Sequence, residues 1–122
     1  MTEYGLQLYS LRDVTKDDLE KGLRAASEIG YKAVEFAGFF GHPAEEVKGW
    51  LDQYHLCPIG THTPLRELLE DYDGVVAYHK AIQCYNLIIP YQDLSTKEKL
   101  DEFIDTVNDL IPRLEADGIT LM

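Results

Sequence analysis

Short apolar segments alternate with amphipathic helical patterns along the whole chain, and this alternation limits the possible folds more than any other feature. Five segments are brief and rich in β-branched or aromatic residues, as in strands buried on both faces of a sheet. They span residues 4–9, 33–36, 57–61, 85–89 and 119–122. Strands that alternate with helices form right-handed βαβ units, so we expect an α/β protein with a parallel sheet.

The first two helices have clear start signals. Thr15 and Asp18 match a capping box, and Gly30 matches a C-terminal cap. Pro43 suits the first position of the second helix. The apolar positions of these two helices are Leu19, Leu23, Ala26 and Ile29, and then Ala44, Val47, Leu51 and Tyr54.

The later helices are less regular. The sequence predicts one short helix up to Tyr72, a break at Asp73–Gly74, and a second helix over residues 75–82. A second capping box, Ser95 to Glu98, precedes the longest amphipathic pattern, which we expect to end at Asp117–Gly118. Pro112 lies inside that pattern and is expected to kink or shorten the helix.

Composition narrows the class of protein. The chain has 122 residues and 45% hydrophobic side chains, enough for one domain, residues 1–122, with its own core. A net charge of −11 argues against nucleic acid and anionic membranes as partners. No apolar run approaches the roughly 20 residues of a membrane span, and the first residues lack a signal-peptide pattern. Cys57 and Cys84 have no paired spacing, so we expect reduced thiols and a cytoplasmic protein.

Functional residues of parallel α/β folds follow the carboxyl ends of the strands. Glu35 stands between apolar residues in a strand expected to be buried, so it faces either a polar cavity or an ion-pair partner such as Arg12. His62 follows the third strand, as a site residue or as the cap of the next helix. Gln7 alternates with leucines, as a ligand contact or as a satisfied core amide.

Other polar residues near the strand ends are weaker candidates. Arg12 either contacts a ligand or pairs with Asp13 or Glu35, and Tyr9 and Tyr91 are candidates for lining a pocket. Three further histidines are expected in loops or on helix surfaces: His42, His55 and His79. A flavodoxin-like receiver domain has a similar length, but it needs an acidic pair after the first strand and an aspartate after the third. The sequence has residues 7–10 and Thr61–His62 there, so this alternative is disfavoured.

Four segments together resemble a known family: GLQLYSLRD at 5–13, GYKAVEFAG at 30–38, THTP at 61–64 and ADGITL at 116–121. They are similar to the N-terminal half of the sugar phosphate isomerase/epimerase family, the xylose isomerase-like TIM barrels. The resemblance implies a partial (β/α)8 barrel, namely the first four βα units and the start of strand five.

The resemblance also implies a function. Members of the family move a proton between adjacent carbons of a keto or hydroxy sugar, using a divalent metal such as Mn, Mg, Co or Zn. It implies that Glu35 and His62 bind the substrate, and we add Gln7, Arg12 and Tyr9 to that set. The family's metal ligands come from later strands, so we predict no metal ligand and no catalytic residue here, and an inactive isolated chain. We further expect a homo-oligomer that covers the exposed sheet edges. The alternative is a non-catalytic half-barrel that serves binding or assembly.

Overall fold

Five parallel strands form one sheet in the computed structural model, which describes residues 5–122. The strands are β1 (Gly5–Gln7), β2 (Ala33–Phe36), β3 (Cys57–His62), β4 (Asn86–Ile88) and β5 (Thr120–Leu121). Their order in the sheet, β1-β2-β3-β4-β5, is their order in the sequence. Each connection is therefore a crossover between neighbouring strands, as in a (β/α) barrel.

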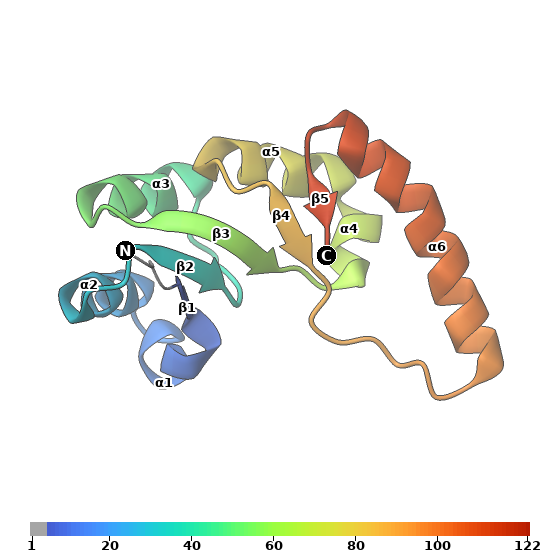
Figure 1. Ribbon diagram of the computed structural model, residues 1–122, viewed down its shortest axis with the longest axis horizontal. Helices are drawn as coiled ribbons and strands as arrows, with labels where there is room; N and C mark the ends of the chain where they lie inside the picture. Colours follow the sequence, from blue (N-terminus) through green and yellow to red (C-terminus); the bar gives the residue numbers. More distant parts are fainter. Residues whose placement is uncertain (1–4) are drawn as a thin grey trace.

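The helices form an arc around the sheet, whose other face is concave (Figure 1). They are a 3-10 turn η1 (Leu8–Leu11), α1 (Arg12–Thr15), α2 (Leu19–Ile29), α3 (Ala44–Gln53), α4 (Leu65–Glu70), α5 (Tyr72–Ile82) and α6 (Lys97–Ala116). The predicted α/β alternation and parallel sheet are confirmed, and the architecture is that of a partial barrel. Across residues 5–122, no helix has both the length and the apolar character needed to cross a bilayer.

The core consists of two clusters of buried side chains. The first gathers Leu8, residues of α2 and α3, and the buried positions of β2, and it extends to Ile82 and Cys84. The second gathers residues of α4 and α5 with Leu87, Leu110, Leu114 and Ile119. Val34 and Phe36 are fully buried in the first cluster. Since side chains alternate along a strand, Glu35 between them points to the opposite, concave face.

Three predicted strands are longer than the observed ones. The first was expected over residues 4–9, of which Tyr4 lies outside the described residues, but β1 ends at Gln7. The chain then turns into η1, which buries Leu8 in the first cluster. The predicted strands at 85–89 and 119–122 are reduced to β4 and β5, while β2 has the predicted bounds. The strand predicted over 57–61 extends one residue further, to His62.

The helix starts needed three corrections, of which one is that Pro43 is the N-cap residue of α3 rather than its first helical residue. Asp18, not Thr15, caps α2, since its carboxylate accepts a hydrogen bond of 3.0 Å from the Lys21 amide. Thr15 ends α1 instead, and its hydroxyl donates to the Leu11 carbonyl. Thr96, one residue after the predicted position, caps α6. Gly30 is confirmed as the cap of α2, in a left-handed conformation with φ of 115°.

Two breaks also differ from prediction. The helix over residues 65–82 is interrupted at Asp71, whose carboxylate accepts a hydrogen bond from the Gly74 amide and caps α5. Asp73–Gly74 therefore lies in the first turn of α5 rather than at the break. Pro112 does not shorten α6, which continues to Ala116. Leu110 and Leu114 are buried on either side of Pro112, and this packing holds the last turns of the helix.

Candidate functional site

Gln7, Glu35 and His62 come together on the concave face, at the carboxyl ends of three neighbouring strands. Gln7 pairs with Glu35 in the register of β1 and β2, and Glu35 pairs with Gly60 of β3. Gly60 leaves room for the carboxylate, because a Cβ there would stand 3.7 Å from Cγ of Glu35 and only 3.2 Å from Cδ1 of Ile88. Three of the five residues predicted to bind substrate thus form one cluster, which we call the polar triad.

Short hydrogen bonds join the polar triad. Oε1 of Glu35 accepts from Nε2 of Gln7 at 2.8 Å and lies 2.7 Å from Nε2 of His62. Nε2 of Gln7 is also 3.1 Å from Nε2 of His62. An amide nitrogen only donates, so both nitrogens donate to Oε1 when Glu35 is ionised. Within residues 5–122, Oε2 of Glu35 accepts no side-chain hydrogen bond, which leaves it available to a ligand hydroxyl.

The hydrogen bonds of the polar triad test three structural alternatives that the sequence left open. Glu35 pairs with His62 rather than with Arg12, and the side chains of His62 and Glu35 keep 18% and 24% of their surface exposed. The cap of α4 is Pro64 with no side-chain hydrogen bond, so His62 does not cap that helix. Gln7 is not a buried core amide, because its side chain reaches Glu35 on the concave face.

Arg12 and Tyr9 pair with each other. The guanidinium of Arg12 lies over the Tyr9 ring at 4.4 Å from its centroid and donates to the Tyr9 carbonyl at 3.1 Å. The predicted pairing of Arg12 with Asp13 or Glu35 is therefore wrong for the described residues. Both side chains line a cavity of about 380 Å³, together with Lys16. Tyr91 is 78% exposed and lines neither this cavity nor the larger one described next.

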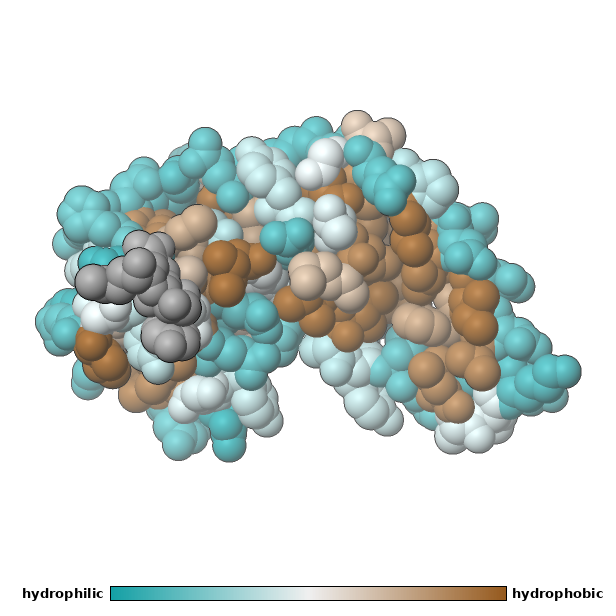
Figure 2. All heavy atoms as spheres, viewed as in Figure 1, coloured by the Kyte–Doolittle hydropathy of each residue, from teal (hydrophilic) through white to brown (hydrophobic). Residues whose placement is uncertain are grey.

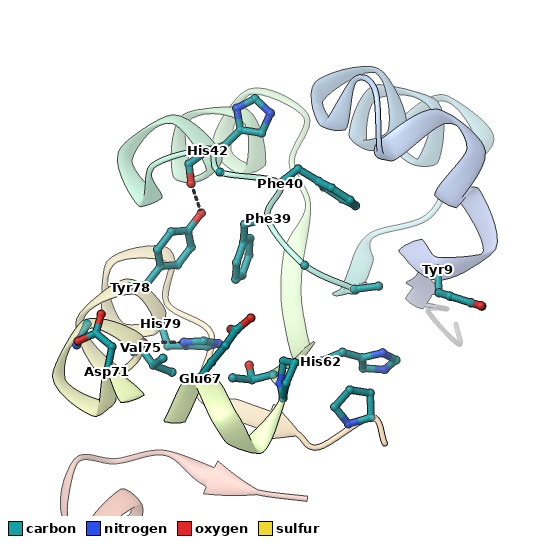
Figure 3. Close-up of a pocket in the computed structure, with 17 residues that line it drawn as sticks. Tyr9, Phe39, Phe40, His42, His62, Glu67, Asp71, Val75, Tyr78 and His79 are labelled. Carbon is teal, nitrogen blue, oxygen red and sulfur yellow. Dashed lines mark hydrogen bonds between the residues drawn. The ribbon is translucent and has the colours of Figure 1, made fainter. Parts of the chain in front are cut away.

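A larger cavity of about 770 Å³ is lined in part by His62 of the polar triad, and Figure 3 shows its lining residues. Its walls come from Tyr9, from the loop over residues 37–42 after β2, from His62 and the residues that follow it, and from α4 and α5. His62 belongs to both the polar triad and the cavity wall. The cavity has the size of a small-molecule site, for which volumes of about 300–1,000 Å³ are usual.

The loop over residues 37–42 is held against α5 by aromatic packing. The Phe39 ring lies 4.3 Å from the Tyr78 ring and 5.0 Å from the Phe36 ring. The Tyr78 hydroxyl donates to the His42 carbonyl at 2.7 Å. Burial raises the pKa of Tyr78 to about 12, so this phenol stays protonated and keeps donating at neutral pH.

His79 was predicted in a loop or on a helix surface, but it is 2% exposed. Its Nδ1 lies 2.7 Å from the Val75 carbonyl, which can only accept, so Nδ1 carries the proton. Nε2 of the neutral ring then accepts from the Thr61 hydroxyl, which in turn accepts from Thr63 at 3.1 Å. Burial lowers the pKa of His79, in agreement with a neutral ring. This network ties α5 to the end of β3 on both sides of His62.

The signal for His79 was present in the sequence. Tyr72, Val76 and Ile82 are buried on the same face of α5, and His79 falls on their helical spacing. The burial of His79 could therefore be predicted from this periodicity, but its hydrogen bond with Thr61 could not.

The residues of the polar triad do not fit a metal site by themselves. In the part of the chain from Gly5 onward, no three histidine, cysteine, aspartate or glutamate side chains lie together as a ligand set. A metal site needs at least three protein ligands, and here only Glu35 and His62 stand in contact. Their mutual hydrogen bond also occupies one potential ligand atom of each residue, Oε1 of Glu35 and Nε2 of His62.

Solved structures show where this fold occurs. The chain superposes on an AP endonuclease, family 2, from Brucella melitensis with a TM-score of 0.76 and 19% identity, covering 99% of this chain and 54% of that one. For a sugar phosphate isomerase/epimerase from Parabacteroides distasonis the TM-score is 0.74 at 19% identity, covering 98% and 49%. For a protein called IolI with a bound zinc atom the TM-score is 0.69 at 12% identity, covering 98% and 50%.

These similarities define the fold class. The chain has the fold of a xylose isomerase-like TIM barrel and spans about half the length of the structures that it matches. This agrees with the predicted partial barrel. No protein-family model and no curated protein sequence matches the chain.

Proposed function

We propose that this chain supplies the sugar-binding part of an isomerase or epimerase of keto and hydroxy sugars. The observation that carries the proposal is the polar triad, in which an amide, a carboxylate and an imidazole meet on the concave face of a barrel-type sheet. The similarity in fold to a sugar phosphate isomerase/epimerase supports the same class of substrate.

Polar groups of the triad suit vicinal hydroxyls. Oε2 of Glu35 accepts a hydrogen bond from one hydroxyl, and the Gln7 carbonyl oxygen accepts from a neighbouring one. Nε2 of His62 is directed at Glu35, so Nδ1 is the ring nitrogen that a ligand hydroxyl can contact. Because Glu35 and His62 are mostly buried, these bonds form in a partly dry environment where they discriminate between hydroxyl arrangements more strongly than in water.

We propose no catalytic step for the chain alone. A divalent metal (Mn, Mg, Co or Zn) is part of the proposed function of the complete barrel, but the polar triad does not supply the ligands for it. Arg12 and Tyr9 remain proposed as ligand contacts at the smaller cavity, where Arg12 and Lys16 are the cations.

The second candidate is an assembly module, and the open sheet favours it. In the described part of the chain, β1 and β5 each have only one neighbouring strand. Figure 2 shows hydrophobic surface between β5 and α6. The exposed hydrophobic side chains of this region include Leu100, Ile104 and Met122, which are 39%, 45% and 70% exposed. We propose that a second copy of the chain covers these edges.

The net charge of −11 disfavours nucleic acid as the partner. The two free cysteines fit a reducing, cytoplasmic location.

A titration of the purified chain with a keto sugar tests the main proposal. With D-fructose as the probe, we expect NMR chemical-shift changes at Gln7, Glu35 and His62. Glu35→Gln removes the charge that holds both donors, so we expect a loss of about 1.5–3 kcal/mol in binding. Glu28→Gln, a charge change on the exposed part of α2, is the matched control. Unchanged binding in Glu35→Gln contradicts the proposal.

A further inference from the structure

The larger cavity extends well beyond the polar triad, which touches it only through His62 (Figure 3). Neither Gln7 nor Glu35 lines it. A sugar held by the polar triad therefore leaves most of the 770 Å³ for another part of the ligand. The chemistry of the cavity walls shows what that part is.

The walls are mainly apolar and aromatic. Phe39 contacts Tyr78 there, and Phe40 and Tyr9 also line the cavity. Phe40 is 46% exposed, although contact of an apolar ring with water is unfavourable in free energy. Its backbone is left-handed, with φ of 53°, between Gly38 and Gly41, whose φ values are 103° and 81°.

This conformation is unusual for an aromatic residue. A left-handed backbone at a residue other than glycine costs about 1 kcal/mol or more and persists where the surroundings impose it. Here it places the Phe40 ring between the two cavities, since Phe40 lines both. An exposed aromatic wall that is held in a strained conformation favours contact with an apolar face of a ligand.

The charges in the cavity exclude an anion. Glu67 and Asp71 line it, and no lysine or arginine does so among residues 5–122. Three histidines line it. His62 is directed at Glu35 and His42 at Glu46, each at 2.7 Å. His79 is bonded to the Val75 carbonyl and the Thr61 hydroxyl, as a neutral ring. A phosphate group in this cavity would meet carboxylates without a cation to offset them.

We propose that the larger cavity binds an uncharged aromatic substituent of an unphosphorylated, hydroxyl-bearing ligand. The hydroxyl end of this assignment rests on the proposed function of the polar triad. The aromatic end rests on Phe39, Phe40 and the absence of cations from the described cavity wall. The substrate class is thus narrowed from sugars in general to neutral conjugates of a polyhydroxy group with a planar ring.

Three glycosides test this on the whole purified chain. The probes are 4-nitrophenyl β-D-glucopyranoside, methyl β-D-glucopyranoside and glucose 6-phosphate, with binding followed by NMR. We expect the nitrophenyl glycoside to bind about tenfold more tightly than the methyl glycoside, because its ring stacks on Phe40. Resonances of residues 37–42 should shift only with the nitrophenyl probe. Glucose 6-phosphate should bind least tightly.

Two pairs of variants locate the effect. Phe40→Gly removes the ring and suits the left-handed backbone, so the protein stays folded while the preference for the nitrophenyl probe falls to near unity. Tyr91→Gly, at an exposed position outside both cavities, keeps the preference. Glu67→Lys should raise the affinity for glucose 6-phosphate, whereas Glu70→Lys, an exposed change on the same helix, should not.

The outcomes separate this inference from the proposed function. Equal affinities for the two neutral glycosides, or the tightest binding for glucose 6-phosphate, overturn the inference even if Gln7 and Glu35 respond. If 4-nitrophenol alone shifts residues 37–42 while no sugar affects the polar triad, the aromatic site stands and the proposed function fails.

Discussion

Replacing Thr61 by valine tests the buried network behind the polar triad. Thr61 is fully buried and His79 is 2% exposed, so no water reaches their hydrogen bond. In Thr61→Val, Nε2 of His79 keeps no partner among the described residues, and an unsatisfied buried acceptor costs about 1–3 kcal/mol. For a chain of this size the melting temperature should fall by roughly 4–12 °C.

A double-mutant cycle gives the prediction its sharpest form. His79→Leu leaves the Thr61 hydroxyl bonded to Thr63, so its polar cost is smaller. The double variant removes donor and acceptor together, and the two single costs should therefore exceed the combined cost by about 1 kcal/mol. Urea unfolding followed by the fluorescence of Trp50, the single tryptophan, measures all four proteins. Additive costs would show that the two side chains do not interact, and would refute the network.

The remaining predictions concern pH, packing, assembly and turnover. Burial lowers the pKa of His79 from 6.5, so the unfolded chain binds more protons than the folded chain. The contribution of His79 to stability is therefore full above about pH 6.5 and is lost as the pH falls through the lowered pKa. Melting curves at pH 7.5 and 5.5 should show a smaller decline in His79→Leu. Gly22→Ala should destabilise the protein by about 1–3 kcal/mol, because the new Cβ overlaps Cγ2 of Thr15. Gly49→Ala should stabilise it by about 0.5–1 kcal/mol, because a Cβ there has no neighbour within 4 Å. Urea unfolding measures both changes. Light scattering should give a dimer or larger assembly, and a monodisperse monomer would end the idea that a second copy covers the sheet edges. Incubation of the purified chain with keto sugars and Mn²⁺ should give no epimerisation, and sustained turnover would mean that the chain contains a complete catalytic site.

Local patterns were sufficient for the sheet and for the polar triad. The bounds of β2 match the short segment Ala33–Phe36, which is apolar except for Glu35. Because Glu35 lies between two buried apolar residues, its carboxylate was expected on the opposite face of the sheet. His62 and Gln7 were found because parallel strands bring their carboxyl ends to one edge. The order of the strands in the sheet, which brings the three ends side by side, was implied by the family resemblance rather than by the alternation itself.

Contacts between distant elements were beyond such patterns. The end of β1 depends on the burial of Leu8 against helices further along the chain. The partner of His79 depends on how α5 packs on β3, and the larger cavity depends on Phe39 stacking against Tyr78, 39 positions away in the sequence. The sequence pattern predicted Thr15 as the cap of α2, but Thr15 is buried at the end of α1 and Asp18 caps the helix.

The strand order has a consequence for biosynthesis. Because every strand lies beside the preceding one, each βα unit finds its place on structure that has already left the ribosome. The described buried residues of the first core cluster lie between Leu8 and Cys84, so that cluster can close before α6 has left the ribosome. The nascent chain thus assembles its barrel wall in the direction of translation, with the polar triad complete once His62 and the first cluster have emerged.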